Sequence, residues 1–249
     1  MQLNNANMIL GENITDAWCK AFKVVYEHSH REVSPLLVSF PVSDVEAIGS
    51  NPIYRTVDTE LFKRNQNSIH TTANTIFPIS LWNSKRKRSF LYERYNRNLR
   101  YIRKDPANRR GIYFERLIAY GASEIKINQL EHIITTWLGG NHRRSALQAQ
   151  IFDPYKDHIH SPMLGFPCLD QIIFSHVGNE SDNGLRVTGV YAMQYIFEKA
   201  FGNYLGLARL GKFMAHEMKL TLREVTCIAC TAKLGDYSKK DLSALNSIL

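Results

Sequence analysis

The alternation of apolar and polar residues along the chain predicts a mixture of helices and strands. Residues 185–197 place apolar or small side chains at every second position, which is the pattern of a strand with one packed face. Residues 89–104 instead repeat apolar side chains at helical spacing, with basic residues on the opposite side. The helices expected in this way are 16–28, 89–104, 128–138, 203–220 and 238–249, and the strands are 34–42, 145–152, 169–177, 185–197 and 224–232.

The remaining long stretch, residues 43–80, shows neither period and is rich in Asn, Thr and Ser. We expect it to consist of loops with at most short strands. The helices and strands do not alternate regularly, which favours an α+β fold over a doubly wound sheet. No internal repeat, low-complexity tract or long linker divides the chain, so we expect a single domain over residues 1–249, with a basic helical insertion at about 84–110.

The composition is typical of a soluble globular protein. Of the 249 residues, 44% are hydrophobic and 22% are charged. No apolar stretch approaches the roughly 18 residues that a membrane-spanning helix needs, and the N-terminus lacks the pattern of a signal peptide. The four cysteines are too few and too scattered for a disulfide scaffold. These features predict a cytoplasmic protein with no membrane partner.

The net charge of +8 is concentrated in one segment of the chain. Residues 85–116 hold twelve of the 31 Lys and Arg residues but three of the 23 acidic ones, so the rest is nearly neutral. Such a segment is either a solvated helix or a nucleic-acid surface, where cations contact phosphates and aromatic rings stack on bases. The basic residues that face away from the apolar stripe are Arg97, Arg100 and Lys104, and the interleaved tyrosines are Tyr92, Tyr95 and Tyr101.

Three features in the second half of the chain are candidates for chemistry. Cys168 follows a proline at the start of an apolar run, where it is either a small buried side chain or a nucleophile. Arg143 and Arg144 follow a glycine pair; two such arginines are either solvated or bind phosphate or carboxylate in a bidentate manner. Asn203 begins the longest expected helix, where it either caps the helix or reads the donor and acceptor edge of a heterocycle.

Cys227 and Cys230 have the spacing of a redox motif or of half a zinc site. No second pair of ligands accompanies them, and they lie in an apolar run that is typical of a buried strand. We therefore predict no metal site in this protein.

Several of these features follow one another in a defined order. A helix that begins "QLEHIITTWLGG" precedes the Arg143-Arg144 pair, and the cysteine stands after a proline in "GFPC". The strand "GLRVTGVYAMQYIF" comes next, and "AFGNYLGLARLGKFMA" with its asparagine follows, while "GIYFERLIAYG" lies upstream at residues 111–121. This succession resembles the thymidylate synthase and pyrimidine hydroxymethylase family over about residues 110–235. The resemblance implies a thymidylate synthase-like α+β domain with a mixed, mostly antiparallel sheet packed by helices.

The resemblance also implies a role for each candidate residue. Cys168 matches the nucleophile that adds to C6 of a pyrimidine nucleotide, so that C5 can attack a one-carbon unit. Asn203 matches the residue that reads the pyrimidine edge, and Tyr113 matches an active-site tyrosine. Arg143 and Arg144 match the pair that binds the nucleotide phosphate of the other subunit in a homodimer. The implied activity is a methyl or hydroxymethyl transfer in nucleotide biosynthesis, with methylenetetrahydrofolate as the donor.

The chain departs from the family pattern at several functional positions. Ala192 and Tyr195 stand where the family has the arginine and the aspartate of its Arg-Ser-x-Asp motif. Leu169 follows the nucleophile, where the family often has histidine, and Glu60 is the candidate for an early catalytic glutamate. These departures leave a second hypothesis open: a nucleotide-binding or interaction module of the same fold without turnover, which could contact nucleic acid through residues 85–116.

Overall fold

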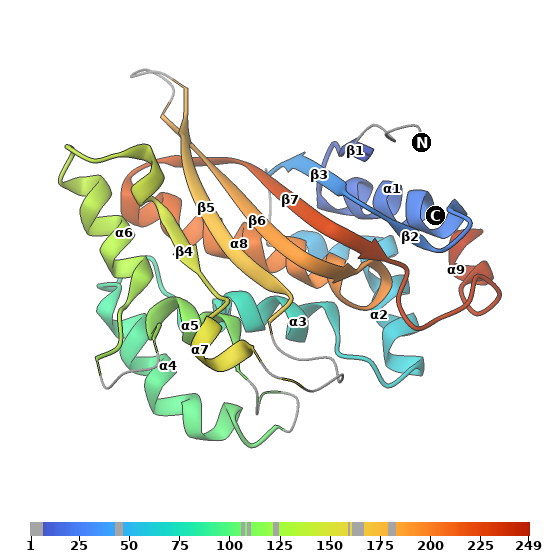
Figure 1. Ribbon diagram of the computed structural model, residues 1–249, viewed down its shortest axis with the longest axis horizontal. Coiled ribbons are helices and arrows are strands. Elements are labelled where there is room, and N and C mark those ends of the chain that lie inside the picture. Colours follow the sequence, from blue (N-terminus) through green and yellow to red (C-terminus); the bar gives the residue numbers. More distant parts are fainter. Residues whose placement is uncertain are drawn as a thin grey trace.

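The structure is a computed structural model that describes residues 7–42, 47–105, 108, 111–121, 125–158, 160, 167–178 and 183–249. Within these residues the strands form one seven-stranded sheet, in the order β1-β3-β7-β6-β5-β4 with β2 paired to β7 (Figure 1). The strands are β1 (Asn7–Leu10), β2 (Glu32–Val33), β3 (Leu36–Pro41), β4 (Gln148–Gln150), β5 (Leu169–Val177), β6 (Gly184–Tyr195) and β7 (Thr221–Lys233).

The sheet is mixed, and most of its strand pairs are antiparallel. β1 runs parallel to β3, and β6 runs parallel to β7. The other four pairs, β2–β7, β3–β7, β4–β5 and β5–β6, are antiparallel. The expected α+β fold, with one mixed and mostly antiparallel sheet in a single domain, is therefore confirmed.

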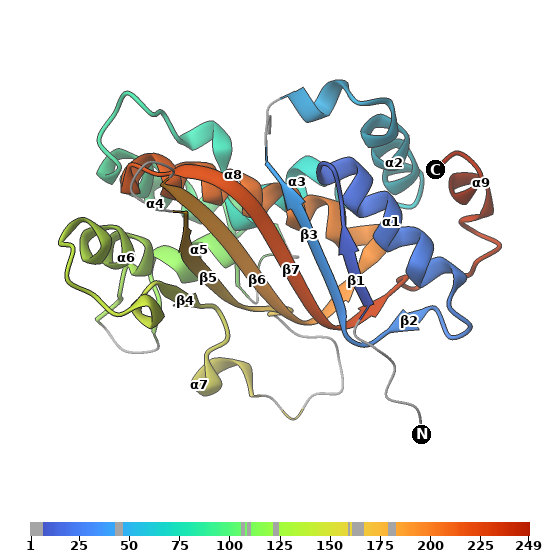
Figure 2. The ribbon, with the colours of Figure 1, turned by 90° about the horizontal axis from the view of Figure 1, so that it is seen from above.

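Helices pack on one face of this sheet, where α1, α3 and α8 lie together (Figure 2). No long helix of the described residues crosses the opposite face (Figure 2). The helices are α1 (Ile14–Glu27), α2 (Pro52–Lys63), α3 (Ile69–Ile76), α4 (Ser89–Ile102), α5 (Tyr113–Ile118), α6 (Gln129–Leu138), α7 (Pro154–Asp157), α8 (Phe201–Met218) and α9 (Ser243–Asn246).

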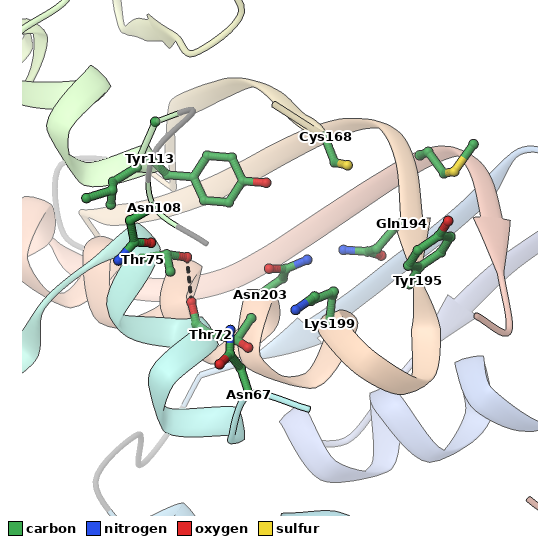
Figure 3. Close-up of a pocket in the computed structure, with 13 residues that line it drawn as sticks. Asn67, Thr72, Thr75, Asn108, Tyr113, Cys168, Gln194, Tyr195, Lys199 and Asn203 are labelled. Carbon is green, nitrogen blue, oxygen red and sulfur yellow. Dashed lines mark hydrogen bonds between the residues drawn. The ribbon is translucent and has the colours of Figure 1, made fainter. Parts of the chain in front are cut away.

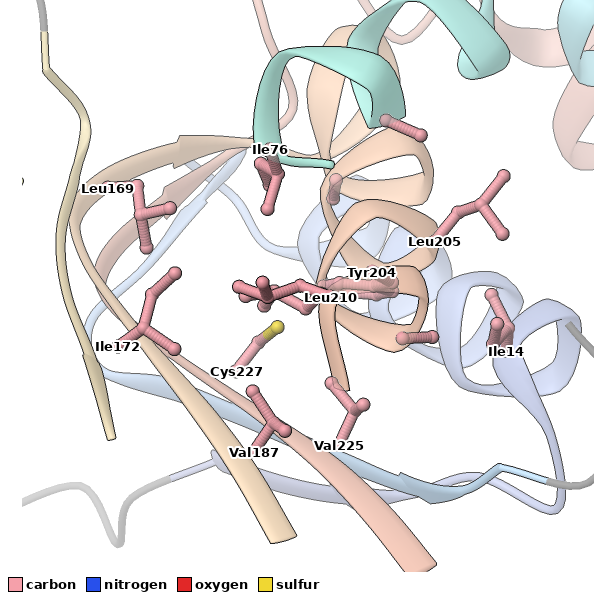
Figure 4. Close-up of a cluster of buried hydrophobic side chains, with 14 of the residues drawn as sticks. Ile14, Ile76, Leu169, Ile172, Val187, Tyr204, Leu205, Leu210, Val225 and Cys227 are labelled. Atoms are coloured by element: carbon pink, nitrogen blue, oxygen red, sulfur yellow. The ribbon is translucent and has the colours of Figure 1, made fainter. Parts of the chain in front are cut away.

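The hydrophobic core lies between α8 and the sheet. Tyr204 and Leu210 of α8 lie over Val187 of β6 and over Val225 and Cys227 of β7, and all five are buried (Figure 4). α8 is buried on nearly every side because α3 covers the flank that faces away from the sheet. No helix of the described residues is both long and apolar enough to cross a membrane.

Two glycines of α8 allow α3 to approach it closely. A Cβ atom on Gly202 would lie 2.5 Å from Cβ of Thr72, and one on Gly206 would lie 2.9 Å from the carbonyl oxygen of Ala73. Any side chain at these positions would force the two helices apart. The glycines thereby place Thr72 next to the first turn of α8.

The expectation of loops over residues 43–80 is wrong, apart from residues 43–46, which lie outside the described residues. This stretch contains α2 and α3. The side chain of Asn51 accepts hydrogen bonds at the start of α2, and Pro52 occupies the first helical position. The side chain of Ser68 caps α3 in the same way. The Asn and Ser residues that suggested loops are the helix caps.

Three other elements are shorter than expected. The strand expected at residues 145–152 is confined to β4, because a 3-10 turn occupies Arg144–Ala146. The strand expected to reach residue 197 ends at Tyr195, and residues 196–200 form a π-helical turn that leads into α8. The expected C-terminal helix is confined to α9, because turns occupy residues 239–242. The expected helix at residues 16–28 is confirmed as α1, and the side chain of Asn13 caps its start.

Candidate functional site

A cavity of about 280 Å³ lies where β5 begins and β6 ends, beside the first turn of α8. We call it the first cavity (Figure 3). Four segments far apart in the sequence contribute to its wall, which is rich in amide, hydroxyl and aromatic groups. Its lining residues are Asn67, Thr72, Thr75, Asn108, Gly111, Ile112, Tyr113, Cys168, Met193, Gln194, Tyr195, Lys199 and Asn203.

Three of the residues singled out from the sequence meet in the first cavity: Cys168, Tyr113 and Asn203 (Figure 3). Cys168 stands directly before β5, and its carbonyl oxygen accepts a 3.0 Å hydrogen bond from the N–H of Ala192 on β6. The residue as a whole is exposed, so it is not a core side chain, whereas its thiol faces the cavity and is partly desolvated there. The strand pair thus presents the thiol at the wall of the cavity.

The structure sets the charge state of Tyr113, the first residue of α5. Burial, followed by the nearby Cys168, raises the pKa of the Tyr113 hydroxyl, although the backbone amides of Cys168 and Leu169 oppose this rise. The hydroxyl therefore stays protonated at neutral pH. A neutral phenol at this point can donate a hydrogen bond to a ligand held beside Cys168.

Asn203 does not cap a helix, so that reading of the sequence is wrong. It is the third residue of α8, and its side chain is 5% exposed and points into the first cavity (Figure 3). Gln194 and Thr72, which are 2% and 5% exposed, lie on the same wall. Among the described residues, Nε2 of Gln194 and Oγ1 of Thr72 have no hydrogen-bond partner.

Buried polar groups without partners are costly, and native proteins usually pair them. Here the unpaired atoms share a cavity with the amide of Asn203, so they form a set of donors and acceptors that suits a flat polar heterocycle. Sequence reasoning found Asn203 but missed Gln194 and Thr72. Nothing local marks these two residues, because their burial comes from the contact of β6, α3 and α8.

The cavity also contains Lys199, which the sequence analysis did not single out. It lies in the π-helical turn before α8, four residues from Asn203, so the two side chains leave the helical segment on the same side. Burial lowers the pKa of Lys199. Burial also raises the pKa of the Cys168 thiol, and Asp170 adds to this rise, whereas Lys199 opposes it.

The two arginines lie away from the first cavity of their own chain. Arg144 begins a short 3-10 turn before β4, and three residues later Leu147 accepts a 2.9 Å hydrogen bond from the N–H of Phe174. Phe174 is six residues along β5 from Cys168, or roughly 20 Å at strand spacing. Arg143 and Arg144 are therefore near the opposite end of β5.

Glu60 also lies outside the first cavity. It is on α2, where its carboxylate forms salt bridges with Lys63 and Arg64. No carboxylate is present among the described residues that line the cavity. Of the two departures from the family motif, Tyr195 lines the cavity, whereas Ala192 is exposed on β6.

A second cavity, of about 320 Å³, adjoins the first and shares Asn67, Thr75, Asn108 and Ile112 with it. Its wall combines apolar side chains with amides and one carboxylate. The residues that only this second cavity uses include Pro78, Leu81, Tyr95, Asn98, Ile102 and Asp105. Apolar side chains combined with a few polar groups are typical of a site for a small organic molecule.

Cys227 and Cys230 do not form a pair on β7. Cys227 is buried under α8 and Cys230 is exposed, because residues three apart on a strand point to opposite faces. In the described part of the chain, no group of three or more His, Cys, Asp or Glu side chains could hold a metal ion.

No family model matches this chain, and no curated protein matches its sequence. The arrangement of side chains in the first cavity is therefore the basis for assigning a function.

Proposed function

We propose that the protein is a thymidylate synthase-like transferase that adds a methyl or hydroxymethyl unit to C5 of a pyrimidine nucleotide. The observation that carries this proposal is the convergence of Cys168, Tyr113 and Asn203 on one cavity. These residues come from three elements, and the motif order alone assigned them to a common site.

The reaction begins with loss of the Cys168 thiol proton to solvent. The thiolate sulfur then bonds to C6 of the pyrimidine, and the electron pair of the C5–C6 double bond moves to C5 and the O4 oxygen as an enolate. C5 would then bond to the carbon of the one-carbon unit and lose its hydrogen as a proton, and the bond between that carbon and the nitrogen of its donor would break. Hydroxide from water would complete a hydroxymethyl group, whereas a methyl group would need a hydride, which tetrahydrofolate can supply as it is oxidised to dihydrofolate. Elimination of the thiolate restores the C5–C6 double bond. Covalent addition thus divides one difficult step into easier ones.

The amides of the first cavity suit this substrate. The edge of a pyrimidine alternates hydrogen-bond donors and acceptors, and a side-chain amide offers one of each. Asn203 and Gln194 can bind this edge, while the neutral hydroxyl of Tyr113 can donate to an oxygen that gains charge. Fixed donors of this kind stabilise developing negative charge most strongly in a site from which water is excluded.

The second cavity supports the use of a folate by the proposed enzyme. Leu81 and Ile102 would pack against the faces of its ring system, and Asn98 and Asp105 would hold the polar edge. Methylenetetrahydrofolate supplies the one-carbon unit when bound. The shared wall of the two cavities would bring this unit near the base beside Cys168.

A homodimer would give the two arginines a role. Both lie near the far end of β5 from Cys168, so the cavity that they could serve belongs to a second copy of the chain. The open face of the sheet offers a surface for that copy, since Leu37, Ile228 and Val190 form a half-buried apolar row across β3, β7 and β6.

We expect sedimentation to give the mass of two chains for the wild type and of one chain for Ile228→Lys, because a charge on this row opposes close packing. Ile228→Val, which keeps the row apolar, should remain dimeric. A monomeric wild type would contradict the proposed dimer.

Tritium release from 5-tritiated nucleotides tests the function directly. We would compare dUMP, dCMP, UMP and CMP, each with and without methylenetetrahydrofolate. Release from one of them is expected, and the preferred nucleotide identifies the base and sugar. Saturable nucleotide binding without any release would instead support the module without turnover.

A second candidate function is nucleic-acid binding by α4. Arg97, Arg100 and Lys104 are exposed and have no salt bridge to another described residue. Tyr101 is 53% exposed and is covered by the cations of Arg100 and Lys104. The expectation of three stacking tyrosines is wrong, because Tyr92 and Tyr95 are buried against the core.

Replacing Arg97, Arg100 and Lys104 together by alanine tests this candidate. If the three cations contact phosphates of a single strand, the slope of log affinity against log salt should fall by about 2 in the triple variant. The matched control replaces Lys63, Lys239 and Lys240, which lie on other surfaces, and should keep the wild-type slope. Equal slopes for both triple variants would contradict nucleic-acid binding by α4.

A further inference from the structure

Lys199 occupies a position that the motif order did not assign. It projects into the first cavity together with Cys168 and Asn203 (Figure 3). It is the cationic side chain among the described residues that line this cavity. Ala192, which is hydrogen-bonded to the carbonyl of Cys168, carries no charge.

The amine of Lys199 has no direct polar partner among the described residues. In the described part of the chain no hydrogen bond or salt bridge to it is formed, although the side chain is half-buried. Such burial is costly for an ammonium group unless an anion is present. A partner that appears only during the reaction would offset this cost.

The charged and titratable groups near the cavity come from four elements. Tyr113 of α5 and Tyr195 of β6 are neutral, because burial raises the pKa of each hydroxyl. Asp170 of β5 acts on Cys168 and opposes its ionisation. Glu198 faces Asp236 and the backbone beyond β7, and it acts on Lys199 from outside the cavity lining. Lys199 is thus the group in this set that favours a thiolate at Cys168.

We propose that Lys199 supplies the positive charge that supports the Cys168 thiolate and, after addition, the pyrimidine enolate. The thiol gives its proton to solvent, and Lys199 acts in its ammonium form, because the charge at Cys168 opposes the lowering of the Lys199 pKa by burial. When sulfur bonds to C6, the negative charge passes from sulfur to C5 and O4 inside the same cavity. The ammonium therefore faces one unit of negative charge before and after the C–S bond forms. The support of the pyrimidine enolate by Lys199 rests on the proposed function.

Alkylation of Cys168 by iodoacetamide tests the role on the free protein. The rate would be measured by mass spectrometry of the peptide between pH 5 and pH 10, for wild type, Lys199→Met and Lys199→Arg. A nearby cation stabilises the thiolate, so alkylation of Cys168 should begin at lower pH in the wild type than in Lys199→Met. We expect Lys199→Met to react about tenfold more slowly at pH 7. Lys199→Arg keeps the charge and should react within about threefold of the wild type.

Two controls accompany this measurement. Cys230 is exposed on β7 and reports the intrinsic rate in the same sample, so its profile should be the same in every variant. Lys63→Met removes a lysine from α2 and should leave Cys168 unchanged. Coincident Cys168 profiles for wild type and Lys199→Met would overturn the proposal. A large difference in Cys168 alkylation between wild type and Lys199→Met, without tritium release from any nucleotide, would support the role of Lys199 and reject pyrimidine transfer. Failure of the Lys199 proposal and failure of the proposed function are therefore distinguishable.

Discussion

Cys168→Ala is expected to lower the rate of tritium release from the preferred nucleotide by at least about 1000-fold. Without the sulfur no bond forms to C6, and the hydrogen on C5 keeps its ordinary low acidity. Folding should be unaffected, because Cys168 is exposed and alanine fills no more space. The measurement compares release by the two proteins at equal concentration of folded protein.

The matched control for this prediction is Cys230→Ala. Cys230 is also an exposed free cysteine, but it lies on β7 and outside the first cavity. This variant should release tritium at the wild-type rate. If Cys168→Ala were as active as Cys230→Ala, a different group would have to be the nucleophile.

Asn203→Ala is expected to lower kcat/KM for the preferred nucleotide by about 100-fold or more. A site built to hydrogen-bond its substrate discriminates strongly when one of those bonds is lost. Both kcat and KM would be measured, because the amide should act in the bound complex and in the transition state.

Asn141→Ala is the control for this variant, since Asn141 is exposed in the turn after α6. It should keep the wild-type kcat/KM. Thermal unfolding of both variants separates lost contacts from lost folding. A folded Asn203→Ala variant with wild-type kcat/KM for all four nucleotides would show that Asn203 does not read the base.

The sequence predicted the elements whose periodicity is local. The alternation in residues 185–195 and the apolar stripe of α1 arise from the contact of one element with the core, and both are visible in a short window. The prediction for residues 43–80 was wrong because the helices there are not marked by a local period. Asn, Ser and Thr are favoured both in turns and at helix starts, and the packing of α3 on Gly202 and Gly206 decides between the two here.

Some residues of the candidate site could likewise be predicted from the sequence, whereas others could not. Cys168, Tyr113 and Asn203 were found because each stands in an ordered motif, and the structure brings them to one cavity. Lys199 was missed because the strand was expected to end at residue 197 and the helix to begin at residue 203, so that Lys199 belonged to neither element. The π-helical turn there is set by tertiary contacts, including the hydrogen bond from the Trp18 indole to the carbonyl of Ile196. That turn places Lys199 and Asn203 on one wall.

Covalent capture of the nucleotide tests the central claim most directly. A fluorine at C5 cannot leave as a cation, so the 5-fluoro analogue of the preferred nucleotide should remain bonded to the protein with the one-carbon donor present. Intact mass should increase by one adduct per chain, and peptide mapping should place it on Cys168. An adduct on another residue, or saturable binding of the analogue without any adduct, would contradict covalent catalysis by Cys168.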